Sequence, residues 1–177
     1  MSTAVQPAPE TTVTPDGANR RTRLRQYQVQ LLERMQAARN NAKRVNQLGV
    51  MIGQERFLLD LTQVGEIVPV PSITVVPLTQ PWYLGLANIR GNLISVIDLA
   101  RYSLNTDTAI GSDSRIITFA NGLGFNCGLL VSRVYGLRHA AGMEVSGDRL
   151  RDADANEWAP LDLAALVSDT RFLHVGF

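Results

Sequence analysis

The spacing of apolar residues changes near Gly49, and the two parts of the pattern predict different elements. Residues 20–47 contain neither proline nor glycine, and apolar side chains recur there at helical spacing. The main row repeats every seven residues at Leu24, Leu31, Ala38 and Val45, with Met35 and Ala42 in the neighbouring row. This pattern predicts one amphipathic helix. Because its apolar stripe is thin and rich in alanine, two interpretations stay open: the helix lies against its own domain, or it binds a partner as a short coiled coil does.

Beyond Gly49 the apolar residues form short runs separated by turn-forming residues. The runs are Leu48–Ile52, Arg56–Leu61, Ile67–Val70, Ile73–Val76, Leu93–Leu99, Arg115–Phe119, Cys127–Val131 and Val134–Leu137. No helical pattern of about 10–15 residues lies between them, which favours a barrel or sandwich over a βαβ fold. Asp98 is expected to cap a short helix, and Leu161–Val167 with Asp162 is expected to form another. The predicted fold class is all-β with short helices.

Four segments follow from these patterns. Residues 1–19, rich in proline, serine and threonine, are predicted to be a flexible leader. Residues 20–47 form the basic amphipathic helix, residues 48–170 the folded domain and residues 171–177 a C-terminal tail. Apolar residues make up 45% of the 177 residues and charged residues 19%, as in globular proteins. This length suits one domain, or two small subdomains that share a core.

The net charge of +1 conceals an uneven distribution. Residues 1–47 contain eight lysines and arginines against three acidic residues, while residues 48–177 contain nine against thirteen. A basic arm can meet nucleic acid, an anionic membrane or an acidic protein surface. Its only aromatic residue is Tyr27, whereas proteins that stack on nucleic-acid bases use several aromatic residues. A solvated helix face is therefore favoured, and a small β-barrel that binds nucleic acid through this helix is the alternative.

The residues that catalysis or metal binding would need are few. The single cysteine, Cys127, excludes an intramolecular disulfide, fits a reducing compartment and is expected to be a buried, inert thiol. His139 and His174 are too few for a zinc site, and no G-x-S-x-G motif occurs. We therefore predict no catalytic residue, no metal, no cofactor and no small-molecule substrate. No signal-peptide pattern and no apolar run of roughly 18–20 residues occurs, so a cytoplasmic protein without membrane insertion is expected.

Three ordered motifs carry a resemblance to a known family. Val64–Ile67 reads V-x-E-I, Ile73–Pro77 reads I-T-x-V-P, and Asn88–Gly91 reads N-x-R-G ahead of a strand that ends in Asp98-Leu99. Over roughly residues 48–167 the chain resembles the CheW coupling proteins of chemosensory pathways.

Two further positions concern the branch of the family and its second subdomain. Trp82-Tyr83, and Ser95 where the flagellar branch usually has proline, are more similar to the PilI-type adaptors of type IV pilus twitching motility. Ser132 stands where the family commonly has aspartate, which puts contacts of the second barrel in doubt.

The resemblance implies a non-catalytic adaptor made of two small SH3-like barrels. Such an adaptor couples the regulatory domain of a CheA-like histidine kinase to the cytoplasmic tip of a chemoreceptor, and it is recruited to membrane-associated or polar receptor arrays. By resemblance, the kinase-binding residues are Val64, Glu66, Trp82, Gly85, Asn88, Arg90 and Gly91. The residues implied for the receptor groove are Ile67, Ile116 and Val131.

The residue types in the central motif are compatible with that role. Gly85 and Gly91 bracket a predicted turn that needs close backbone approach or a positive φ, and Arg90 projects from it with five fixed donors. Glu66 is the natural partner of Arg90, and both a local ion pair and a contact with a partner protein stay open. Trp82 is either a core residue or an interface hot spot.

Overall fold

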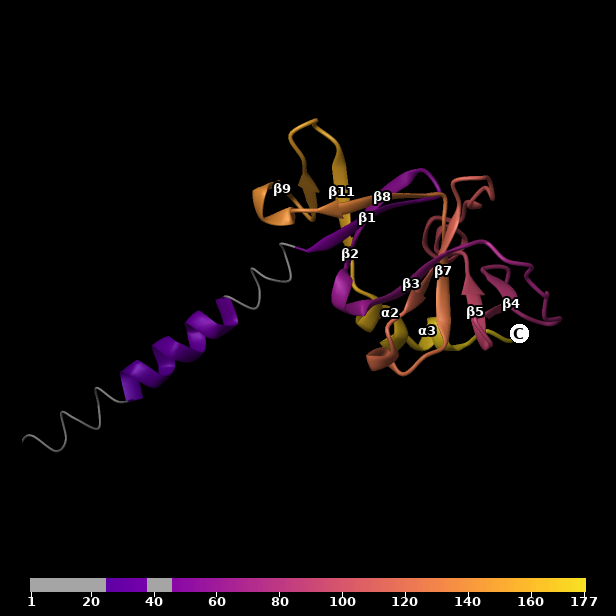
Figure 1. Cartoon of the computed structure of the whole chain (residues 1–177), viewed down its shortest axis with the longest axis horizontal. Helices are drawn as coiled ribbons and strands as arrows, with labels where there is room; N and C mark the ends of the chain where they lie inside the picture. The colour runs from indigo at the N-terminus through magenta and orange to yellow at the C-terminus, as the bar shows by residue number, and fades with distance from the viewer. Residues whose placement is uncertain (1–24, 38–45) are drawn as a thin grey trace, which may run out of the picture. The chain divides into compact units, whose positions relative to one another are not determined.

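The computed structural model describes residues 25–37 and 46–177, which belong to two compact units, Met1–Asn40 and Asn41–Phe177. In the first unit, residues 25–37 are helical and every side chain among them is exposed (Figure 1). The predicted helix is confirmed over these residues. The leader at 1–19 and the helix flanks at 20–24 and 38–45 lie outside the described residues. Gln47 is the first residue of a strand and not the last of the helix.

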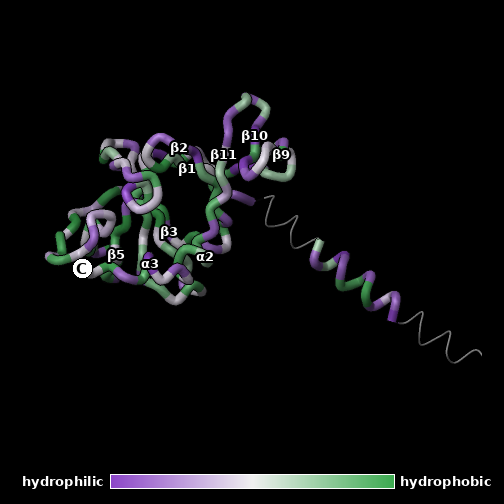
Figure 2. The backbone as a smooth tube through the Cα atoms, turned by 180° about the vertical axis from the view of Figure 1, so that it is seen from behind, coloured by the Kyte–Doolittle hydropathy of each residue, from purple (hydrophilic) through white to green (hydrophobic). Residues whose placement is uncertain are grey.

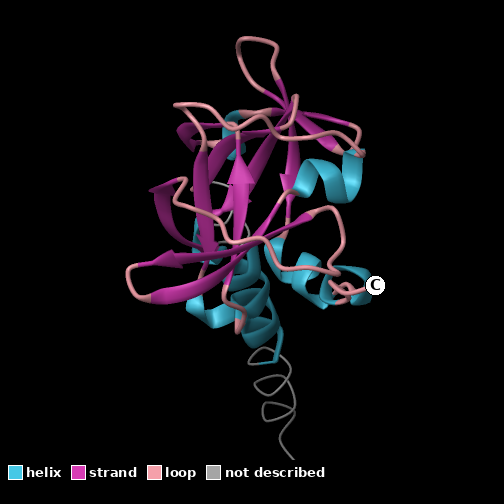
Figure 3. Ribbon diagram, turned by 90° about the vertical axis from the view of Figure 1, so that its right-hand side faces the viewer, coloured by secondary structure: helices cyan, strands magenta, loops and turns pink. Residues whose placement is uncertain are grey.

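The second unit is built from two β-sheets with short helices at their margins (Figures 1 and 3). The six-stranded sheet has the order β8-β1-β2-β11-β10-β9, and the five-stranded sheet has the order β3-β6-β7-β5-β4. The strands are β1 (Gln47–Ile52), β2 (Glu55–Asp60), β3 (Val64–Pro69), β4 (Tyr83–Ile89), β5 (Asn92–Ile97), β6 (Arg115–Phe119), β7 (Cys127–Val131), β8 (Arg133–Arg138), β9 (Glu144–Ser146), β10 (Arg149–Arg151) and β11 (Glu157–Leu161). The helical segments are η1 (Leu61–Gln63), η2 (Ala100–Leu104), η3 (Asn121–Leu123), η4 (Ala140–Gly142), α2 (Leu163–Ser168) and α3 (Thr170–Leu173). The predicted all-β class with short helices is confirmed.

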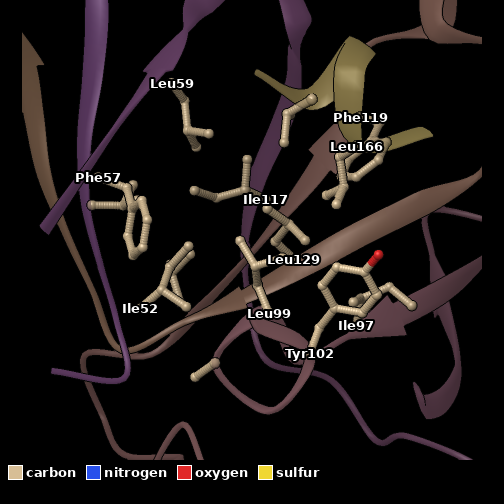
Figure 4. Packing of buried hydrophobic residues seen from close by; sticks show 14 of the residues in the cluster. Ile52, Phe57, Leu59, Ile97, Leu99, Tyr102, Ile117, Phe119, Leu129 and Leu166 are labelled. Carbon is tan, nitrogen blue, oxygen red and sulfur yellow. The ribbon is translucent and has the colours of Figure 1, made fainter. Parts of the chain in front are cut away.

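Several strands read as continuous apolar runs because both of their faces are buried. In β7, Leu129 and Val131 enter a central core shared by the two sheets, while Leu130 packs on the opposite face of the five-stranded sheet. In β2, Leu59 faces the central core and Leu58 packs beside Trp158. Figure 4 shows the central core, and Figure 2 shows hydrophobic stretches along the strands. The central core therefore holds the two sheets together as one unit.

The two edges of the five-stranded sheet are tied together through the segment that follows β3. Thr74 and Leu86 exchange two backbone hydrogen bonds, at 2.8 and 2.9 Å, which attach this segment to β4. Gly85 permits that approach, because a side chain there would collide with the Thr74 carbonyl oxygen and its φ is +136°. The strand predicted at Ile73–Val76 is thus reduced to a single bridge at Thr74.

Both predicted aspartate caps precede helical segments. Asp162 accepts from the Ala164 and Ala165 amides at the start of α2. The buried Asp98 carboxylate accepts from the Ala100 amide at 3.1 Å, and from the Thr108 amide and hydroxyl at 3.0 and 2.8 Å. Asp98 therefore caps the turn η2 and also fixes the loop that follows it.

Residues 171–177, predicted to be a tail, pack against the domain. Phe172 is buried and stacks on Trp82, with ring centroids 5.8 Å apart. The Gln80 amide donates to the Val175 carbonyl at 2.7 Å, and Thr79 pairs with Gly176.

Candidate functional site

The N-x-R-G motif forms the tip of the β4–β5 hairpin. Ile89 pairs with Asn92, so Arg90 and Gly91 are the two central residues of the turn, with φ angles of +52° and +85°. Two positive φ angles define the type I′ geometry that matches the twist of a hairpin. The Asn88 Oδ1 atom accepts from the Gly91 amide at 2.9 Å and closes the turn. Three of the four motif residues thus have a direct structural role, while the Arg90 side chain projects from the turn.

Arg90 forms an ion pair with Glu66 of β3. The Arg90 Nε and Glu66 Oε2 atoms lie 3.2 Å apart, and the two side chains are 74% and 46% exposed. The predicted pairing is therefore confirmed. Such an exposed pair stabilises a fold by only about 0–1 kcal/mol. Both groups stay accessible to another protein.

A bulge in β3 presents Glu66 and its neighbours to solvent. The pairing of β3 with β6 shifts register between Val64 and Ile67, and Gly65, Glu66 and Ile67 are all exposed. The Glu66 amide donates to the Thr118 hydroxyl at 2.7 Å, which fixes the bulge. Bulges of this kind redirect side chains. Here the bulge brings a carboxylate and the 43% exposed Ile67 to the surface together.

A cleft of about 410 Å³ lies beside the ion pair, between β3, the hairpin and the connection from β6 to β7. Its apolar floor includes the buried Ile89, Ile94 and Phe119. Exposed asparagines and Phe125, which is 38% exposed, line its rim.

Four of the residues predicted for the interface are buried, and the surface assignment of their side chains is corrected accordingly. Trp82 is 6% exposed because it packs on Tyr102 and Phe172 in the central core, which decides between its two interpretations. Gly85 lies beneath the Thr74 segment. Ile116 and Val131 are fully buried on opposite faces of the five-stranded sheet, so neither can line an open groove.

The other predicted positions lie at or near the surface. Glu66, Ile67, Asn88, Arg90 and Gly91 are exposed, and Val64 is half-buried.

Leu93 is a surface residue that the sequence reasoning missed. It pairs with Asn88 across the hairpin and is 59% exposed. Leu93 shares a face of β5 with the buried Ile97, while Ile94 and Val96 lie on the other face, so both faces of this strand meet a core. Leu93 is exposed because it lies beside the hairpin turn, and that position is the signal that could have identified it. We call Glu66, Ile67, Asn88, Arg90 and Leu93 the hairpin surface.

The described residues show little reactive chemistry. Burial raises the pKa of the Cys127 thiol to about 11, so the thiol stays protonated at neutral pH and is a poor nucleophile. Within residues 25–37 and 46–177, no three His, Cys, Asp or Glu side chains are grouped to hold a metal ion. The same residues contain no helix that is both long and apolar enough to cross a membrane.

Residues 47–160 match the family model of the CheW-like domain. The chain belongs to this family. Members of the CheW family are non-catalytic scaffold proteins of chemotaxis-like signalling. The matched residues of this CheW-like chain include the hairpin surface, whereas the basic arm precedes them.

Two known proteins are similar to this CheW-like chain. It is 30% identical to protein PilI of Pseudomonas aeruginosa over 92 residues, which are 52% of this chain and 51% of PilI. The chain thus spans about half the length of that curated relative. The crystal structure of the scaffolding protein TtCheW from Thermoanaerobacter tengcongensis superposes with a TM-score of 0.56 at 26% identity, covering 67% of this chain and 88% of TtCheW. The predicted CheW-like fold and the resemblance to PilI are confirmed.

Proposed function

We propose that this protein couples the regulatory domain of a CheA-like histidine kinase to the cytoplasmic tip of a chemoreceptor, in a pathway that controls type IV pilus twitching. The observation that carries the proposal is the exposed Arg90–Glu66 pair at the tip of a rigid hairpin. Its small contribution to stability leaves recognition as its main physical role.

The composition of the hairpin surface suits a protein partner. Ile67, next to Glu66 in β3, and Leu93, three positions after Arg90 in the hairpin, expose large apolar side chains. Arginine is among the residues that dominate binding energy in protein interfaces, and the cores of such interfaces are more apolar than their rims. The backbone beneath Ile67 and Leu93 is held by the pairing of β3 with β6 and of β4 with β5, so little ordering would accompany binding. We therefore assign the kinase contact to this surface.

The receptor contact rests on family membership and on one exposed residue. Of the three groove residues implied by the resemblance, Ile67 alone has its side chain at the surface. A receptor tip would therefore meet the β3 side of the hairpin surface.

Ser95 supports the assignment to the pilus branch. Its amide donates to the Asn126 carbonyl at 2.9 Å, and its hydroxyl lies 3.1 Å from the Tyr83 hydroxyl. Proline, the usual flagellar residue at this place, has no amide hydrogen to donate. A proline at this place would remove both the Ser95 amide hydrogen bond and the contact with Tyr83, and PilI is a relative that the sequence matches, which supports the assignment.

Substitution of Arg90 by asparagine separates recognition from folding. Asparagine tolerates the positive φ that strains arginine by about 1–2 kcal/mol, while the lost ion pair contributes about 0–1 kcal/mol. The free energy of unfolding should therefore fall by no more than about 1 kcal/mol, or rise slightly. We expect the affinity for the kinase regulatory domain to fall at least tenfold in calorimetric titrations.

Arg151→Gln is the matched control, because Arg151 forms a similarly exposed ion pair with Glu157 in the other sheet. This variant should bind the kinase domain like the natural chain. Unchanged binding by Arg90→Asn would contradict the proposal, whereas unfolding of that variant would show that the arginine is structural.

A further inference from the structure

Two arginines of the folded unit differ from all its others. Residues 46–177 contain no lysine, so arginine supplies every permanent positive side-chain charge there. Arg90, Arg101, Arg133, Arg149 and Arg151 pair with carboxylates, and Arg115 and Arg171 donate to backbone carbonyls. Among the described residues, Arg56 and Arg138 contact neither a carboxylate nor a carbonyl acceptor.

Both of these arginines lie over the same aromatic ring. The guanidinium carbons of Arg56 and Arg138 are 5.8 and 5.9 Å from the centroid of the Tyr135 ring. Arg138 also lies 5.2 Å from the Trp158 ring, which meets Tyr135 edge to face at 5.5 Å. These residues come from β2, β8 and β11 of the six-stranded sheet. We call Arg56, Tyr135, Arg138 and Trp158 the arginine-aromatic stack.

Gly49 makes room for the stack. It pairs with both β2 and β8, and a side chain there would lie 2.9 Å from the Arg138 Cγ atom and from the Trp158 ring. The arginine stem and the indole therefore fill the space above Gly49. As a result, the Arg138 guanidinium is held in place before any partner arrives.

The arginine-aromatic stack has two positive charges and no acidic side chain of its own to neutralise them. The Nε atom of Arg138 is buried without an acceptor, and a second positive charge lies across the same tyrosine ring. Buried donors are normally satisfied, and like charges repel. Stacking on an aromatic face leaves the in-plane N–H donors of a guanidinium free to meet an anion. Arg56, Tyr135 and Arg138 are each half-buried, so an outside group can reach the exposed atoms of these side chains, but not the buried Arg138 Nε atom.

We propose that the arginine-aromatic stack binds carboxylate side chains of an acidic segment of a partner protein. Carboxylates suit the guanidinium fork because they accept two parallel hydrogen bonds. The folded unit carries nine basic against thirteen acidic residues, so nucleic acid, which is charged at every phosphate, is repelled more strongly than a short protein segment with a few carboxylates. The site lies on the six-stranded sheet, whereas the hairpin surface lies on the five-stranded sheet.

Side-chain NMR of the full chain tests the proposal directly. The Nε–H signals of arginines are followed while a glutamate-rich peptide of about 16 residues is added. We expect the signals of Arg56 and Arg138 to shift and that of Arg151 to stay in place, because Arg151 already has a carboxylate partner. A glutamine-rich peptide of equal length should shift none of them. Because each Nε–H signal belongs to one arginine, peptide binding at this site is distinguished from binding at the basic arm, which also attracts acidic peptides.

Variants supply the second measurement. Arg56→Gln with Arg138→Gln should weaken the shifts of the remaining stack signals and lower the peptide affinity of the folded unit at least tenfold. Arg138→Lys should weaken binding as well, because lysine keeps the charge and loses the planar fork. Should the double variant fail to fold, Arg56→Gln alone is measured, since Arg56 has no buried unsatisfied atom.

Three outcomes would overturn the proposal: no shift of either signal, equal shifts with the glutamine peptide, or larger shifts with a single-stranded oligonucleotide of matched charge. The last would mark a nucleic-acid site. Kinase binding by the double variant should be unchanged, because the kinase contact is assigned to the hairpin surface. A failure of the carboxylate proposal can therefore be distinguished from a failure of the kinase proposal.

Discussion

Asp152 connects a surface loop to a core tryptophan. Its carboxylate accepts from the Trp158 indole at 2.9 Å, from the Asn156 amide at 2.9 Å and from the Asp154 amide at 3.0 Å. Partial burial pushes the pKa of Asp152 upward, but these hydrogen bonds outweigh that effect and lower the pKa to about 2. Trp158 is 1% exposed, so its N–H group depends on this acceptor.

Asp152→Ala should therefore lower the free energy of unfolding by about 1–3 kcal/mol at neutral pH, the usual penalty for a buried donor without an acceptor. Since the folded pKa lies below the ordinary value of 3.8, the stabilisation is complete above that value and is lost as the pH falls through about 2. The difference in melting temperature between the natural chain and the variant should shrink from pH 5 to pH 2. Asp154→Ala is the control in the same loop, and an equal loss there would contradict the assignment.

The strand β4 depends on close contact with the segment around Thr74. Gly85→Ala places a methyl group against the Thr74 carbonyl and forces alanine to a φ of +136°. Such strain, together with loss of the Thr74–Leu86 bridge, should destabilise the fold by about 2–4 kcal/mol in denaturant titrations. Gly122→Ala is the control, because nothing lies within 4 Å of its added methyl group. A cost below about 0.5 kcal/mol for Gly85→Ala would show that the bridge is dispensable.

The strands that were predicted from the sequence differ in burial from the strands that were missed. The runs at β6 and β7 were predicted with the observed bounds because both faces of these strands are buried and the runs are continuously apolar. The strands β9 and β10 are three residues long and mostly exposed, so their sequence carries little apolar signal. The strand β4 was not predicted, because Gly85 and Gly91 resembled the ends of one turn, although Gly85 lies within β4 and only Gly91 lies in the turn.

The sequence predicted which residues make up the candidate site more accurately than which of their side chains are exposed. The Arg90–Glu66 pair followed from charge and motif alone. The burial of Ile116 and Val131 could not follow, because an apolar run indicates that a strand is buried without showing which neighbours cover each face. Phe172, which covers Trp82, lies 90 positions away in the sequence, and no local pattern joins the two.

At the scale of the whole molecule, the central core joins two sheets that carry different surfaces. Strands from both sheets, with Leu163 and Phe172 from α2 and α3, contribute to this core. The hairpin surface and the arginine-aromatic stack thus belong to one compact unit. That arrangement suits an adaptor, because two partners can bind one rigid unit without competing for the same residues.

Removal of residues 1–40 tests whether the basic arm is needed for these roles. The second unit begins at Asn41, and the family match begins at residue 47. Because the core residues all belong to the second unit, the shortened chain should melt within a few degrees of the full chain and bind the kinase domain with unchanged affinity. Calorimetry of both chains measures the two quantities. The removed segment holds six arginines against three acidic residues, so retention on an immobilised polynucleotide at low salt should decrease. Loss of kinase binding would instead place part of the docking surface in the arm, and strong, salt-sensitive retention that depends on the arm would favour the nucleic-acid alternative.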